Sequence, residues 1–118
     1  MTYSNRALRR RPRVERRVLA MLRDENEPAV DDALVAAFVR LRHLARRKGL
    51  VIQRPDALYL GDDELTLLSW IAAAQRIAVA HLRPSDRCLA AIITRCAALL
   101  EGAGLRLYPL TLYRHRLP

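Results

Sequence analysis

The chain is 118 residues long, 52% of its residues are hydrophobic, and its formal net charge is +9. This length and apolar content suffice for one domain with a single core. The positive charge, carried by arginine in all but one position, favours an anionic partner such as a nucleic acid or an acidic protein surface. Gln75 and Arg76 interrupt the most apolar run, 65–82, and the N-terminus has no apolar signal region, so we expect a cytoplasmic protein with no membrane partner.

The first two segments are a basic arm and a helix. Residues 1–12 contain several arginines and little to bury, and Pro12 separates them from the next segment, so we expect a flexible basic arm. Apolar residues then recur at helical spacing, which predicts a helix over residues 13–24. We expect residues 13–118 to form a single helical domain.

An acidic turn precedes the second predicted helix. Residues 24–32 carry several acids and no base, and Asp31 and Asp32 suit the start of a helix. The helix is predicted over residues 30–48, with Gly49 as its stop. One face is apolar, and the opposite face is basic in its second half. In its first half the opposite face is apolar too, so another helix or another subunit should cover it; its residues are Val35, Ala36 and Val39.

The rest of the chain continues as a hairpin and two more helices. β-branched and aromatic residues flank a Pro-Asp corner, which predicts a short β-hairpin over residues 50–60. Helices are predicted over 62–83, as the central core helix, and over 85–101, with a break at Pro84. The weakly alternating end, 105–118, indicates an edge strand or a docking arm. The fold class is therefore mainly α with about four helices.

No pattern of catalytic or metal-ligating residues emerges. None of the three histidines, His43, His81 and His115, lies three or four residues from another His, a Cys or a carboxylate that could complete a metal site. The acids at 62–64 are expected from helix capping rather than acid/base catalysis. Without a glycine-rich phosphate loop or a nucleophile elbow, we expect neither an enzyme nor a bound cofactor.

The two cysteines indicate a reducing compartment. Cys88 and Cys96 lie in one predicted helix, so their Cα atoms should be roughly 12 Å apart at the rise of an α-helix. A disulfide needs Cα atoms within about 7 Å, so we expect two free thiols.

The stretch LRHLARRKGLVIQRPDALYL, which makes up nearly all of residues 40–60, resembles the recognition helix and wing of winged helix-turn-helix DNA-binding domains. The resemblance is carried by Leu41, Leu44, Arg46, Arg47, Gly49, Leu50, Val51, Arg54, Pro55, Asp56, Tyr59 and Leu60. It implies that Arg54 in the wing and the pair Arg46 and Arg47 contact phosphates. Because Asp31 and Asp32 would repel phosphates at the start of the same helix, we expect contact with the backbone rather than with base edges.

The sequence supports two hypotheses of function. The first is a small basic DNA-associated or regulatory protein, a homodimer, that contacts the backbone of duplex DNA through an arm and a helix patch. Its candidate residues are Arg9, Arg10, Arg11, Arg13, Arg40, Arg42, Arg46, Arg47, Lys48 and Arg54. The alternative is a non-enzymatic helical protein–protein interaction module, an adaptor or regulator, whose apolar surfaces bind a partner chain without nucleic acid. A third interpretation gives the helix patch no partner and assigns it to solubility and to the helix dipole.

Overall fold

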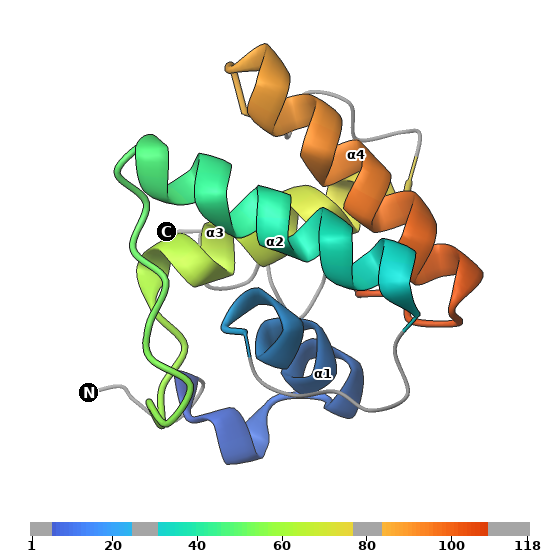
Figure 1. Ribbon diagram of the computed structural model, residues 1–118. Coiled ribbons are helices and arrows are strands. Elements are labelled where there is room, and N and C mark those ends of the chain that lie inside the picture. The colour runs from blue at the N-terminus through green and yellow to red at the C-terminus, as the bar shows by residue number, and fades with distance from the viewer. Residues whose placement is uncertain (1–5, 25–30, 77–83, 109–118) are drawn as a thin grey trace.

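The computed structural model describes residues 6–24, 31–76 and 84–108, which form a helical fold (Figure 1). Its elements are the short 3-10 helix η2 (Leu8–Arg10) and the α-helices α1 (Arg13–Leu22), α2 (Asp32–Arg47), α3 (Asp62–Ala74) and α4 (Arg87–Gly102). The prediction of a mainly α fold with four helices is confirmed for these residues, and the start of each helix lies within two residues of its predicted position.

Two helix ends differ from the predicted ones by more than one residue. The helix predicted over 13–24 ends at Leu22, because Asp24 has a positive φ of 67°, which an α-helix does not accommodate. The helix predicted over 62–83 ends at Ala74, and residues 77–83 lie outside the described residues.

The predicted β-hairpin over residues 50–60 is wrong: the segment is a loop without a strand ladder. Two of its backbone amides donate to carboxylates at the start of α3. Val51 N donates to Asp63 Oδ2 at 2.7 Å, and Gln53 N donates to Glu64 Oε2 at 3.0 Å. An isolated antiparallel bridge joins Tyr59 to Ala7 instead. The two halves of the loop therefore pair with other segments and not with each other.

A buried ion pair fixes this loop to the helices. The guanidinium of Arg23 and the carboxylate of Glu64 are fully buried and 2.7 Å apart. Arg23 also donates to the carbonyl oxygens of Ala57 and Tyr59, at 2.8 Å and 3.0 Å. The end of α1, the start of α3 and the loop before α3 are thus joined at one point.

The C-terminal segment shows no strand where the structure describes it. Leu105 and Leu107 are buried, and Gln75 at the end of α3 donates to Leu105 O at 3.0 Å and accepts from Leu107 N at 2.9 Å. Residues 109–118, the rest of the predicted edge strand or docking arm, lie outside the described residues.

The core lies between α2, α3 and α4, with α1 closing one side. α2 packs against α4 and α1, and it passes in front of α3 in Figure 1. The inner face of α2 contributes Phe38 and Leu41, which are at most 1% exposed, while α3 is buried on most sides, as predicted. This arrangement leaves the outer face of α2 uncovered by the other described helices.

Candidate interaction surface

Two of the predicted contact residues are buried and serve the fold. Arg11 is 7% exposed and pairs with Glu15 at 2.7 Å. Arg42 is 8% exposed and donates to the carbonyl oxygens of Met21 and Leu22 at 3.0 Å and 3.2 Å. A guanidinium at these carbonyl groups stabilises the C-terminal end of α1. Neither side chain is presented to an external partner.

Two further predicted residues are exposed but form ion pairs within the chain. Lys48 forms an ion pair with Asp86 at 2.7 Å, and Arg54 lies 3.5 Å from Asp56. The hydrogen bonds from Lys48 and from the backbone amide of Leu89 hold the pKa of the Asp86 carboxyl below its usual range. The Lys48 pair joins the end of α2 to the start of α4, so these two helices run antiparallel side by side.

The other six predicted residues are exposed, and the structure shows no hydrogen bond or ion pair for them among the described residues. They are Arg9, Arg10 and Arg13 on η2 and α1, and Arg40, Arg46 and Arg47 on α2. Arg16, Arg87 and Arg95 are likewise exposed and show no hydrogen bond or ion pair among the described residues, but they were not among the candidates from the sequence. By contrast, Asp32 is the one described carboxylate without such a partner.

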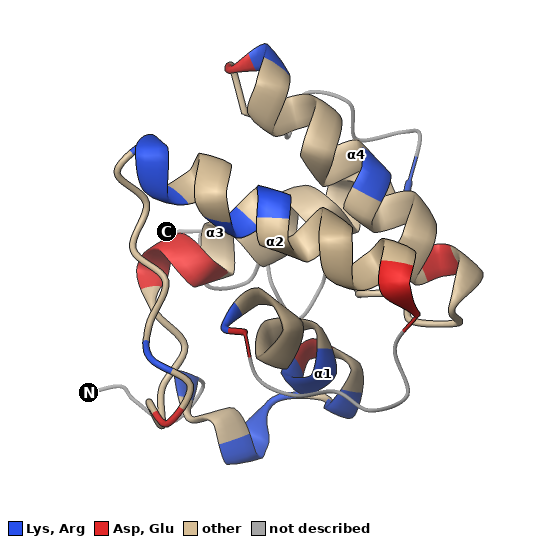
Figure 2. Cartoon of the chain, viewed as in Figure 1, with Lys and Arg blue, Asp and Glu red and all other residues tan. Residues whose placement is uncertain are grey.

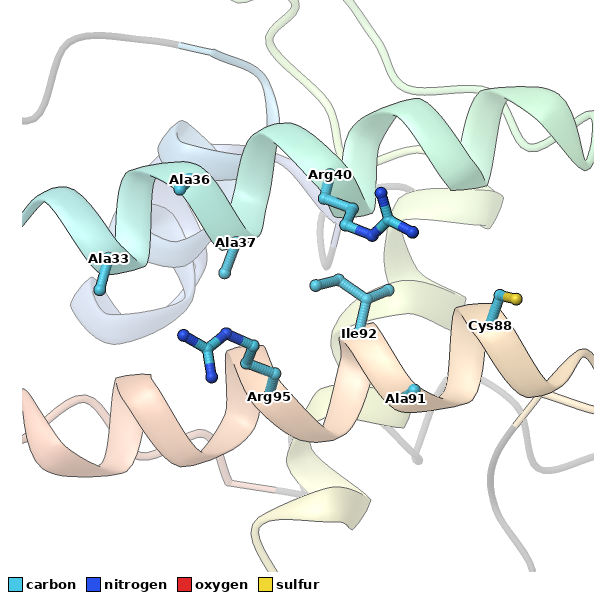
Figure 3. Close-up of a pocket in the computed structure, with 8 residues that line it drawn as sticks. All are labelled: Ala33, Ala36, Ala37, Arg40, Cys88, Ala91, Ile92 and Arg95. Carbon is cyan, nitrogen blue, oxygen red and sulfur yellow. The ribbon is translucent and has the colours of Figure 1, made fainter.

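Arg40 and Arg95 lie at a groove between α2 and α4 (Figure 3). The groove has a volume of about 450 Å³ and is otherwise formed by small and apolar residues. Arg40 reaches it from α2 and Arg95 from α4, at different points along the row of side chains. The remaining lining residues are Ala33, Ala36, Ala37, Cys88, Ala91 and Ile92. The groove therefore combines an apolar floor with two cationic groups.

The outer face of α2 changes character along its length, as the sequence predicted. Val35 and Val39 in its first half are 48% and 50% exposed, so neither α1 nor α4 covers them. Its second half presents exposed arginines and His43. Figure 2 shows the start of α2 in the acidic colour and its other end in the basic colour.

The two cysteines differ in environment. Cys88 is exposed at the groove, whereas Cys96 is buried, and both are free. Burial raises the pKa of the Cys96 thiol to about 12, so its reactive thiolate is scarce at neutral pH.

Within the described ranges, no three His, Cys, Asp or Glu side chains gather as metal ligands would. In those ranges no helix combines the length and apolar character needed to cross a membrane.

No family model, curated protein or solved structure matches the chain.

Proposed function

We propose that the protein is a non-enzymatic regulatory protein that binds the sugar-phosphate backbone of nucleic acid through exposed arginines. The observation that carries this proposal is the imbalance between free cations and free carboxylates in the described residues. Nearly every carboxylate there already has a hydrogen bond or ion pair inside the chain, whereas Arg9, Arg10, Arg13, Arg16, Arg40, Arg46, Arg47, Arg87 and Arg95 are exposed and show none among the described residues. The excess positive charge is thus available at the surface for an external polyanion.

The arginines near the groove are the best-placed contacts. Arg40 and Arg95 project from two helices that are packed together and joined by the Lys48–Asp86 ion pair. Side chains on rigid helices lose less freedom on binding than those on a loop. Their forked guanidinium groups suit phosphate oxygens. The groove residues between them offer no base-reading hydrogen-bond donors or acceptors, which favours contact irrespective of nucleotide sequence.

The wing of the winged-helix resemblance has no part in this proposal. The segment predicted as a hairpin is a loop, and its Arg54 lies near Asp56. Arg11 and Arg42 are likewise excluded because they are buried. The free thiols suit a reducing compartment, and we propose a cytoplasmic location.

Binding to labelled duplex DNA of unrelated sequences, measured by fluorescence anisotropy, tests the proposal. We expect the double variant Arg40→Ala/Arg95→Ala to bind all sequences more weakly and to lower the salt slope by about 2, near 1 for each lost phosphate contact. The matched control is Arg106→Ala, since Arg106 lies 3.7 Å from Glu101. Equal affinity of the double variant and the wild type would show that these arginines are not the contacts.

The apolar groove favours a second candidate function, a protein interaction module. An amphipathic partner helix could place apolar side chains over Ala37 and Ile92 and carboxylates near the two arginines. The exposed thiol at the groove provides the test, because Cys88 should react with a thiol reagent in the folded protein while buried Cys96 does not. A protein partner that co-purifies in stoichiometric amount should slow the reaction of Cys88. Co-purification of nucleic acid that high salt removes would instead support the first function.

A further inference from the structure

The outer face of α2 carries one continuous stripe of residues, which we call the α2 stripe. Spacings of three and four residues place its members on one side of a helix with 3.6 residues per turn. The α2 stripe comprises Asp32, Ala36, Val39, His43 and Arg46, with Val35 beside it. α1 contacts α2 through Arg42, and α4 faces Ala33, Ala37 and Arg40 across the groove. Ala36 lies at the edge of that groove, and the other members of the stripe are exposed on the side that neither helix covers.

The two ends of the α2 stripe carry opposite charges that have no partner among the described residues. Asp32 lies at the start of α2 and Arg46 near its end, and Val39 is seven residues from each. At about 1.5 Å per residue, the two charges are roughly 21 Å apart along the axis. They are therefore too far apart to neutralise each other within one chain.

We propose that the α2 stripe binds a second copy of this chain, with the two α2 helices antiparallel and Val39 of both copies at the two-fold axis. In this register Asp32 of each copy lies opposite Arg46 of the other, and Val35 lies opposite His43. The same arrangement covers the half-exposed valines. A symmetric dimer of this kind needs a self-complementary surface, which the α2 stripe provides because its charges are reversed about its centre.

The charges also select the orientation and the occupant. A parallel pair of α2 helices would place arginine against arginine and aspartate against aspartate, which is unfavourable. A foreign helix would need a carboxylate opposite Arg46 and a cation opposite Asp32. A second copy in the antiparallel orientation provides both by symmetry. A contact along about four turns of one helix buries less area than a standard protein interface, so the dimer should be weak and should dissociate on dilution.

Sedimentation velocity of the full chain, from low micromolar to near-millimolar concentration without nucleic acid, tests the inference. The wild type should shift from monomer to dimer. Asp32→Arg and Arg46→Asp should each weaken dimerisation at least tenfold, because each creates two like-charge contacts across the axis. The double variant Asp32→Arg/Arg46→Asp should restore the dimer, because the two ion pairs form again with their charges exchanged.

Two controls keep the result interpretable. Arg87→Asp reverses an exposed charge of α4 outside the α2 stripe and should leave the dimer intact, and thermal melts should show that every variant folds. Val39→Asp, which changes a half-exposed residue, should give a folded monomer by placing two carboxylates at the axis. A wild type that stays monomeric at every concentration, or a double variant that behaves like the single ones, would overturn the inference. Neither outcome depends on whether nucleic acid is bound.

Discussion

The arginines of this protein divide into internal and external groups. Arg23 is fully buried and reaches Glu64 and two loop carbonyl groups, whereas Arg40 and Arg95 face an open groove. A buried charge is tolerated only where an opposite charge and hydrogen bonds replace water. The internal arginines therefore hold the chain together, and the external ones are left exposed to solvent.

We expect Glu64→Gln to be one of the most destabilising single substitutions in the protein. It leaves the Arg23 guanidinium buried without an opposite charge, and breaking such a pair costs about 3–5 kcal/mol of unfolding free energy. Chemical denaturation followed by circular dichroism measures this loss.

Arg54→Gln serves as the comparison, since it removes an ion pair whose side chains are 85% and 77% exposed. Exposed pairs of this kind contribute less than about 1 kcal/mol. Equal losses for both substitutions would contradict the structural role assigned to Arg23 and Glu64.

The two groups of arginines cannot be told apart from the sequence alone. Arg10 and Arg11 are adjacent in a basic run, yet the first is exposed and the second is paired with Glu15 inside the fold. Arg42 belongs by periodicity to the basic back of its helix, but the end of α1 lies against it. Burial of an arginine depends on which carbonyl and carboxylate groups the fold brings near, and local spacing does not contain that information.

At the scale of elements, the helices were predictable and the hairpin was not. Helical periodicity and capping residues act within a few turns, and Asp31 indeed accepts the amide of Ala33 at 2.7 Å. The segment before α3 has strand-like composition, but Asp63 and Glu64 bind its amides in place of a second strand. A strand needs a partner for its backbone, and the choice of partner is made by tertiary contacts.

The end of α2 gives a test at this scale. Gly49 follows the helix with a φ of +82°, a conformation that costs a residue with a side chain about 1–2 kcal/mol. We expect Gly49→Ala to lower the free energy of unfolding by that amount, although nothing lies within 4 Å of the added methyl group.

Gly102→Ala is the matched change, because Gly102 is the last residue of α4, its φ is not positive, and its added methyl group also meets open space. It should stabilise the protein slightly. Destabilisation of both variants to the same extent would show that the backbone conformation at Gly49 is not the cause.

At the scale of the whole molecule, packing of α4 beside α2 creates the candidate surface. Arg87 and Arg95 were missed in the sequence because they are isolated on a mostly apolar helix, and only the antiparallel pairing of α2 and α4 brings Arg95 to the same groove as Arg40. The exposed apolar half of α2 was predictable from helical phase. Within the described residues no other helix covers it, and the dimer proposed above would do so.

The proposal that exposed arginines bind phosphates is tested most directly by the affinity of the wild-type protein for duplex DNA over a series of salt concentrations. If free arginines bind phosphates, the logarithm of the association constant should fall linearly with the logarithm of the salt concentration, with a slope of about −0.9 for each phosphate contact. The slope should be alike for unrelated duplex sequences. Absence of binding at low salt, or an affinity that does not change with salt, would contradict the claim.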